Sequence, residues 1–336
     1  MGGNRIKYID LLRGFAILLV VMGHALERNG YSDEFLYNTI YSFHMPLFFC
    51  ISGFVTMSSC KFSIDTKASD YGRYIYKKFI AILLPCIVWS FFINKFFFVD
   101  SIDLHKLWSY IQHTLYTNSF YWFLPCLFNL LVVFSTWKFI LDRFKRKSVI
   151  FEIILLLFMF GGVTYFSSID YLRSVSSYFI PFFIGVMMSK YKNLHDLVIE
   201  NKVTYGLCFV FYCLIVGYFG NHSPGFTNKC IRLATGILSI PILFNFFSHT
   251  QFYRVTEDVL LKLGKNSLLI YLIHFVFVNN LPVPADMGIW IQMIVFGILA
   301  VFIGLTAVLA AKIIEKSPFL SLFMLGKYST DSIKSR

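Results

Sequence analysis

An arginine and a histidine stand inside an otherwise apolar stretch of sequence near the N-terminus. Arg13 and His24 belong to the run Tyr8 to Glu27, which is long and apolar enough to predict a membrane-spanning helix. They are eleven positions apart, close to three full helical turns, so the spacing predicts that both side chains project from one face. Because an unpaired charge inside a membrane segment is costly, ionisable residues there indicate a functional site.

The chemistry that this pair could perform is proton transfer beside a fixed positive charge. Histidine exchanges protons near neutral pH, and Glu27, three positions after His24, could orient the imidazole as a carboxylate partner. Each residue also has a structural interpretation. His24 could be a hydrogen-bonded histidine of a helix bundle, and Arg13 could form a buried ion pair with Asp10.

The composition indicates a polytopic membrane protein. The 336 residues are 57% hydrophobic and 14% charged, whereas charged residues make up roughly a quarter of a soluble domain. A net charge of +12 could suggest nucleic acid, but most basic residues lie in short loops between apolar runs, where they indicate topology. The seven cysteines form no C-x-x-C pair, so neither a disulfide framework nor a metal site is expected.

Apolar runs predict an all-α bundle of about ten transmembrane helices in the inner or plasma membrane. The basic residues concentrate in alternate connections, which predicts that both termini are cytoplasmic. We expect residues 1–316 to form one transmembrane domain and residues 317–336 to form a cytoplasmic tail. The runs cover approximately residues 8–28, 35–57, 79–98, 120–137, 149–166, 175–189, 203–220, 229–247, 267–283 and 288–311.

A basic cluster precedes the third run. Arg73 and Lys77 share a helix face at positions i and i+4. With Lys78 they lie just under the predicted cytoplasmic surface, where they could bind phosphates. The alternative is an anchor for anionic lipids.

Three further residues are candidates for substrate binding. Ser52, with Gly53, forms a small polar spot where a thin ligand could approach, although helix packing through small residues is the alternative. Trp122 could form a pocket wall or belong to an interfacial aromatic belt. His274 is a third candidate ionisable group within a span, and a structural hydrogen-bonded role is its alternative.

The sequence lacks the motifs of several enzyme classes. It contains no G-x-S-x-G, no H-E-x-x-H, no GK[ST] loop and no glycine-rich dinucleotide fingerprint, which argues against serine hydrolases, zinc proteases and ATPases. It also shows no internal repeat of the kind that secondary transporters use.

Taken together, these stretches resemble the integral-membrane acyltransferase-3 family, which O-acylates cell-surface polysaccharides and related glycans. The Arg-x10-His span and the FF-x-x-SG motif are its more specific parts, and Lys77 and Lys78 stand where paired arginines are common in the family. A lysine offers a point charge where arginine offers a fork. The resemblance extends in order over nearly the whole chain and rests on IDLLRGFAILLVVMGHA, FHMPLFFCISGF, RYIYKK, YWFL, FFIGV at 182–186 and LGKNSLLIYLIH.

The resemblance implies a ten-helix acyltransferase that takes acyl groups from cytoplasmic acyl-CoA, with His24 and Arg13 both essential. His24 would take the proton of a sugar hydroxyl as it attacks the thioester, or would itself carry the acyl group. Acetyl-CoA is the expected donor substrate, without a tightly bound cofactor, and the acceptor would be a surface polysaccharide or a lipid-linked glycan precursor. The acceptor's identity and the oligomeric state are left open.

A glycan or glycolipid transporter is the alternative function, with Arg13, His24 and His274 lining a conduit. A purely structural membrane partner is the third. A single polar stripe on one helix, without inverted repeats, favours the enzyme.

Overall fold

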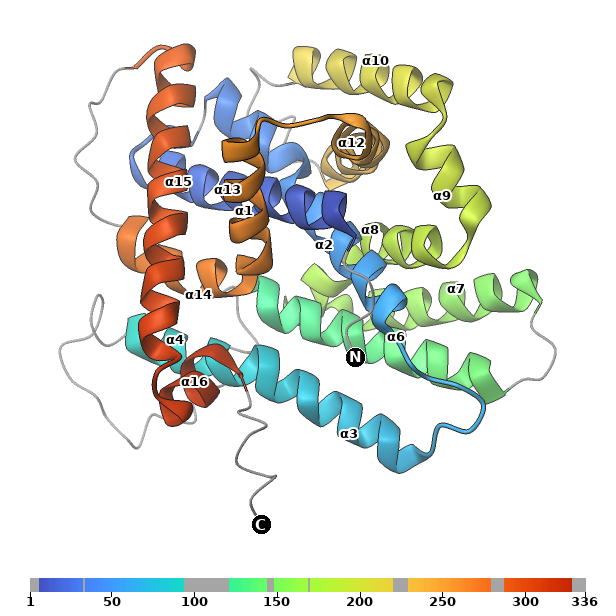
Figure 1. Ribbon diagram of the computed structural model, residues 1–336. Helices are drawn as coiled ribbons and strands as arrows, with labels where there is room; N and C mark the ends of the chain where they lie inside the picture. The colour runs from blue at the N-terminus through green and yellow to red at the C-terminus, as the bar shows by residue number, and fades with distance from the viewer. Residues whose placement is uncertain are drawn as a thin grey trace. The chain divides into compact units, whose positions relative to one another are not determined.

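The computed structural model describes residues 6–32, 34–93, 121–143, 148–168, 170–219, 229–278 and 287–327. All regular elements within these ranges are helices, and none is a strand (Figure 1). They are α1 (Lys7–Arg28), α2 (Phe35–Ser59), α3 (Ala68–Lys78), the π-helical turn η1 (Phe79–Leu83), α4 (Leu84–Ile93), α6 (Phe123–Arg143), α7 (Val149–Tyr165), the short η4 (Phe166–Ser168), α8 (Asp170–Lys190), α9 (Lys192–Ile199), α10 (Lys202–Phe219), α12 (Lys229–His249), α13 (Arg254–Lys265), α14 (Ser267–Val278), α15 (Ile289–Ile314) and α16 (Pro318–Leu325).

A helix occupies each of the ten apolar runs, which confirms an all-α polytopic membrane bundle. Seven continuous helical stretches among the described residues are long and apolar enough to cross a membrane, one of them made of α3, η1 and α4, and the bent pair α13 and α14 would make an eighth span. The difference from ten lies in α7, α8 and α14. Helix α7 has 17 residues, and α14 joins α13 at an angle of 90°. Four predicted runs have ends outside the described residues, at 94–98, 120, 220 and 279–283.

The helices form two compact units. The first contains Met1–Ser59 and Ile180–Leu309, and the second contains Cys60–Phe179 and Ala310–Arg336.

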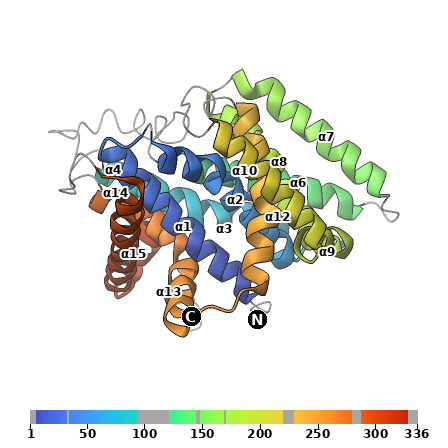
Figure 2. The ribbon, with the colours of Figure 1, turned by 90° about the horizontal axis from the view of Figure 1, so that it is seen from above.

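Helix α1 is the central helix of the first unit. It contacts α2, α12, α13 and α14, and Figures 1 and 2 both show α13 directly beside it. Leu12, Ile17 and Leu26 are fully buried. A helix that is apolar around most of its circumference is stable only where neighbours surround it, so the sequence of α1 requires this central place.

Two glycines bring α1 and α13 unusually close. A Cβ atom on Gly14 would lie 2.1 Å from the carbonyl oxygen of Leu260, and one on Gly264 would lie 1.9 Å from the carbonyl oxygen of Asp10. Any other residue at these positions would separate the backbones. Because α14 follows α13 after a single residue, this contact also holds α14 near the polar face of α1.

Helix α2 contains a proline in its interior, and another helix compensates for it. Pro46 has no N–H, so the carbonyl of Ser42, four residues earlier, loses its helical partner. The Thr235 hydroxyl of α12 donates to that carbonyl at 3.0 Å, and the proline ring packs against Gly236. A backbone acceptor inside a membrane must be satisfied by protein, so α12 completes α2.

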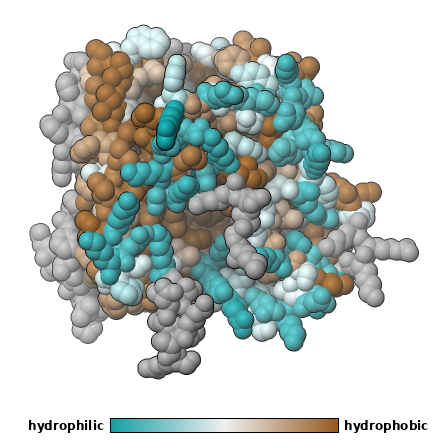
Figure 3. Space-filling model, in the orientation of Figure 1, coloured by the Kyte–Doolittle hydropathy of each residue, from teal (hydrophilic) through white to brown (hydrophobic). Residues whose placement is uncertain are grey.

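The outer surfaces of several helices are apolar. Phe302 of α15 is 63% exposed, and Figure 3 shows the side chains of α15 as a brown, hydrophobic column. In the second unit, Phe158 of α7 is 78% exposed. Large apolar side chains that face outward in this way are suited to contact with lipid.

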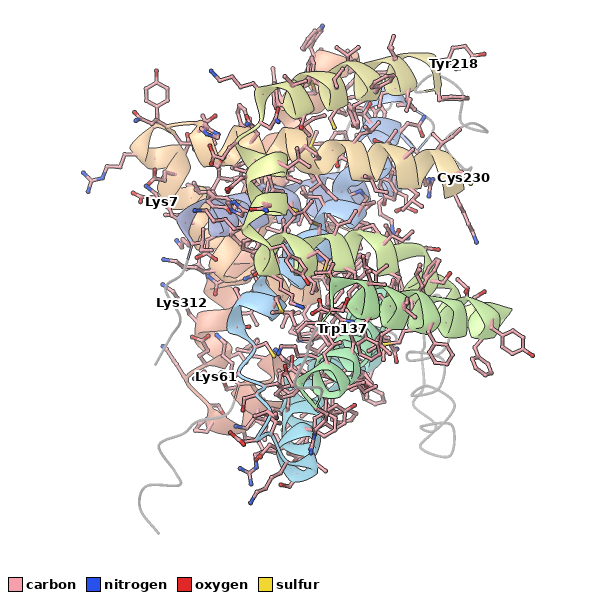
Figure 4. All side chains as sticks on the ribbon, turned by 90° about the vertical axis from the view of Figure 1, so that its right-hand side faces the viewer. Lys7, Lys61, Trp137, Tyr218, Cys230 and Lys312 are labelled. Atoms are coloured by element: carbon pink, nitrogen blue, oxygen red, sulfur yellow. The ribbon has the colours of Figure 1, made fainter. Side chains whose placement is uncertain are left out.

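Helices α1 and α12 of the first unit begin at opposite ends of it. In Figure 4, Lys7 at the start of α1 and Cys230 near the start of α12 lie at opposite sides. This is the alternation that the ten-run topology predicts for these two helices. Which end faces the cytoplasm stays a prediction from the distribution of basic residues.

The second unit packs α3, α4, α6 and α16. The hydroxyls of Tyr71 on α3 and Thr136 on α6 are 3.0 Å apart, and the Trp89 indole donates to the Met324 carbonyl at 2.8 Å. Part of the expected cytoplasmic tail is therefore the helix α16, packed on α4. Residues 328–336 of that tail lie outside the described residues.

Candidate active site

A carboxylate holds His24. Its Nδ1 lies 3.3 Å from Oε2 of Glu27, one turn later on α1. Because a carboxylate only accepts hydrogen bonds, Nδ1 carries the proton of the neutral ring and the lone pair is on Nε2. The side chain of His24 is 20% exposed. An accessible imidazole whose tautomer is set by a carboxylate can act as a general base.

A tyrosine from α2 completes this group. The Tyr41 hydroxyl donates to Oε2 of Glu27 at 3.0 Å and lies 3.5 Å from Nδ1 of His24. Its ring stacks on Tyr37, with the ring centroids 4.0 Å apart. Glu27 is thus held by two donors from two helices. Tyr41 belongs to no motif of its own in the sequence, and only its position two residues before FHMPLFFCISGF could have indicated it.

His274 of α14 lies beside His24. The centroids of the two imidazole rings are 5.4 Å apart, and Phe275 packs on the ring of His24 at 4.7 Å. His274 is 0% exposed. Its Nδ1 contacts the carbonyl oxygens of Ile270 at 3.1 Å and Tyr271 at 2.8 Å. Since carbonyls only accept, Nδ1 is the protonated nitrogen and Nε2 is an acceptor.

Arg13 also faces α14. Its Nη2 donates to the Ser267 hydroxyl at 3.0 Å. Arg13 and His24 therefore both meet α14, which agrees with the single face predicted from their spacing. Asp10 is buried one turn before Arg13, and an ion pair between them stays a prediction.

Two distant stretches of sequence thus build one group of polar side chains, here called the polar layer. It contains Arg13, His24 and Glu27 of α1, Ser267 and His274 of α14, and Tyr41 of α2. Arg13 and Ser267 are 254 positions apart, yet the N-terminal Arg-x10-His span and the stretch LGKNSLLIYLIH supply each other's partners. Ser267 was not singled out in the sequence, because nothing local distinguishes it from a helix-starting serine.

The motif containing Ser52 packs helices together. The Ser52 hydroxyl donates to the Phe48 carbonyl of its own helix at 2.8 Å. A Cβ atom on the adjacent Gly53 would lie 1.9 Å from the Phe182 carbonyl oxygen, and one on Gly185 would lie 1.9 Å from that of Cys50. These contacts between α2 and α8 favour the packing interpretation of the motif.

The remaining candidates belong to the second unit. Arg73 and Lys77 of α3 are exposed, whereas Lys78 is partly buried with its amine 5.4 Å from the centroid of the Tyr74 ring. Trp122 stacks on Tyr178 with the centroids 5.4 Å apart.

In the next basic segment along the chain, Lys138 is paired with an acidic residue of the same helix. The Lys138 amine contacts Oδ1 of Asp142 at 2.7 Å, and residues 144–147 lie outside the described ranges. Lys138 is therefore a weaker candidate for phosphate binding than the lysines of α3.

A family model described as "Acyltransferase domain" matches residues 6–313. The chain belongs to the acyltransferase-3 family. The matched residues 6–313 include every candidate residue described above.

Two relatives each match part of this acyltransferase-3 member. The nodulation protein NolL of Sinorhizobium fredii (strain NBRC 101917 / NGR234) is 32% identical over 92 residues, covering 26% of this chain and 24% of its own. The nodulation protein NolL of Mesorhizobium japonicum (strain LMG 29417 / CECT 9101 / MAFF 303099) is 34% identical over 92 residues, covering 26% and 23%. The match thus spans about a quarter of these relatives. No solved structure gives a significant match.

Proposed function

We propose that this protein is a membrane O-acyltransferase that moves an acyl group, most simply acetyl, from cytoplasmic acyl-CoA to a glycan hydroxyl. The acceptor is a surface polysaccharide or its lipid-linked precursor. The observation that carries the proposal is the geometry of His24, whose Nδ1 is held by Glu27 while the lone pair remains on Nε2. Membership of the acyltransferase-3 family supports it.

In the proposed reaction, Nε2 of His24 takes the proton of the acceptor hydroxyl. The hydroxyl oxygen then attacks the thioester carbonyl, and the tetrahedral intermediate collapses with loss of the CoA thiolate. His24 returns its proton to that thiolate, so the ester, CoA and the neutral enzyme result. Glu27 stabilises the transient imidazolium, because a carboxylate bonded to Nδ1 favours the charged ring. Tyr41 orients that carboxylate by donating a hydrogen bond to it. Direct acylation of His24 followed by transfer is the other route.

The proposed role of Arg13 is to hold negative charge on the donor. Eleven residues along a helix correspond to about 16 Å, so the guanidinium lies well away from a carbonyl placed at Nε2 of His24. This separation favours donor binding over a direct contact with the oxyanion. Ser267 orients the guanidinium, and Asp10 is proposed as a further partner.

The charged end of CoA is proposed to bind Arg73, Lys77 and Lys78 at the cytoplasmic rim. Its phosphates require positive charge, and these residues supply it close to the predicted membrane surface. Trp122 is proposed to line the donor path. Ser52 is proposed to supply a small polar contact to substrate. Residues 1–316 would form the catalytic domain and residues 317–336 a cytoplasmic tail.

The decisive experiment uses purified protein in lipid nanodiscs with acetyl-CoA radiolabelled in the acetyl group. An acyltransferase releases CoA and produces radiolabelled acetylated glycan, or radiolabelled acetate where water is the acceptor. A glycan transporter produces neither. The matched variant His24→Gln should abolish release at equal incorporation into nanodiscs. Loss of an acetyl resonance from surface glycan in a deletion strain, detected by NMR, would then identify the acceptor.

A further inference from the structure

The Nε2 atom of His274 is a buried hydrogen-bond acceptor without a partner among the described residues. The other ring nitrogen is fully used, because Nδ1 donates to the carbonyls of Ile270 and Tyr271. The lone pair on Nε2 therefore remains, on a side chain that is 0% exposed.

A buried acceptor of this kind is unfavourable unless a donor reaches it. Most buried polar atoms in folded proteins are satisfied, so each exception requires an explanation. His274 lies beside His24, with the ring centroids 5.4 Å apart. A donor group on a substrate bound at His24 is thus the nearest chemical explanation.

The surroundings of His274 select the kind of donor group. The ring of Phe275 packs against it at 4.3 Å and that of Tyr271 at 5.6 Å, and the adjoining Leu272 and Ile273 are buried. A sugar brings several hydroxyls, and most of them would be buried unsatisfied in such a place. A thin, mainly apolar chain that carries one isolated N–H group fits better.

We propose that Nε2 of His274 accepts a hydrogen bond from the amide N–H nearest the thioester on the pantetheine arm of the acyl donor. This inference rests on the proposed function. Two methylene groups separate that nitrogen from the thioester sulfur, so a thioester held at His24 brings the amide to the neighbouring ring. His274 is then a donor-binding residue, and the amide N–H that it binds is present in all acyl-CoA thioesters.

The test compares acetyl-CoA with an analogue in which this amide N–H is replaced by an ester oxygen. The parent should use the analogue with a kcat/KM lower by about tenfold, the usual effect of one buried hydrogen bond. His274→Met, which has no strong acceptor, should use both donors equally well. His274→Gln can place an amide oxygen near the position of Nε2 and should keep part of the preference.

His44→Met is the matched control. His44 is also a buried histidine whose Nδ1 donates to a backbone carbonyl one turn earlier, that of Ile40 at 2.8 Å. This variant should keep the parent's ratio between the two donors, because general damage to packing affects both donors alike.

Two results would overturn the inference while leaving the proposed function intact. A parent that turns over both donors equally would show that Nε2 binds only a water molecule. A His274→Met variant that keeps the parent's preference for the amide donor would place the N–H contact elsewhere. If that variant does not fold, His274→Gln decides: a preference smaller than the parent's supports the contact, and the parent's full preference overturns it. A parent that releases no CoA from acetyl-CoA would instead overturn the proposed function, and with it this inference.

Discussion

The polar layer between α1 and α14 and the basic cluster on α3 differ in where the contacts of their polar residues come from. In the layer, the partners come from distant parts of the chain: Arg13 bonds Ser267, 254 positions away, and Tyr41 of α2 bonds Glu27. In the cluster, the contact of Lys78 is with Tyr74, four positions earlier on the same helix, and Arg73 and Lys77 are exposed.

This difference follows from the surroundings of the two regions. Inside the membrane a polar side chain is costly without a partner, and residues of other helices bond Arg13 and Glu27. At the membrane surface, water and lipid headgroups satisfy cations, and a cluster needs no such contacts. Substitutions in the layer should therefore act strongly and individually, whereas substitutions in the cluster should act weakly.

The largest expected effect is that of His24. His24→Ala and His24→Gln remove the proposed base, so transfer from acetyl-CoA should fall by about a hundredfold to ten-thousandfold. The measurement is release of CoA by protein purified at equal yield. Near-normal activity of both variants would end the assignment of His24.

Arg13 should come next, because its charge has a fixed place in the layer. Arg13→Met removes the charge and should reduce activity strongly, whereas Arg13→Lys should retain more of it, and Ser267→Ala should act less than either. Initial rates at several acetyl-CoA concentrations measure the order. If Arg13→Met and Arg13→Lys are equally active, Arg13 is a structural partner of Asp10, and Asp10→Asn should lower the yield in detergent.

Glu27→Gln tests the orientation of the imidazole. The amide keeps the shape of the side chain but loses the charge that holds Nδ1, so kcat should fall by about tenfold to a hundredfold with little change in KM. Tyr41→Phe, which leaves the carboxylate in place, is the milder matched variant. A rate for Glu27→Gln equal to that of the parent would leave His24 without a carboxylate partner in catalysis.

The smallest effects should come from the α3 cluster. Arg73→Gln, Lys77→Gln and Lys78→Gln should each raise the KM for acetyl-CoA several-fold, since a surface point charge contributes about 1 kcal/mol. Acetyl-dephospho-CoA, a donor without the 3′-phosphate, identifies the residue that binds this phosphate. The parent should prefer acetyl-CoA to this donor, and only the variant of the phosphate-binding residue should lose that preference. If all three variants keep the parent's ratio, the cluster anchors lipid and does not bind the donor.

The sequence predicted the helices well because an apolar run of sufficient length has few alternatives. It also predicted that Arg13 and His24 share a face and that Glu27 lies near His24, because both inferences depend only on helical periodicity. These are properties of a single helix, and a single helix can be deduced from its own residues.

The contacts between helices were not predictable in the same way. The pairing of Arg13 with Ser267, and that of Tyr41 with Glu27, depend on how helices pack, which periodicity does not determine. The sharp bend between α13 and α14 was also missed, although Gly264 and Asn266 stand at that point and both weaken a helix. The hydroxyl of Thr235 on the Ser42 carbonyl is a further contact that only the packed bundle shows.

The bend at Asn266 also bears on how the protein is made. Helices α13 and α14 have 12 residues each, about 18 Å of helix, whereas the hydrocarbon core is about 30 Å thick. Over the residues that the structure describes, neither half is long enough to be an independent span, and the backbone at the bend needs surrounding protein. Helix α1 is synthesised long before them, so the hydrogen bond between Arg13 and Ser267 forms only after α14 has been synthesised. The polar layer is thus completed late in biosynthesis, when the last third of the chain joins the first helix.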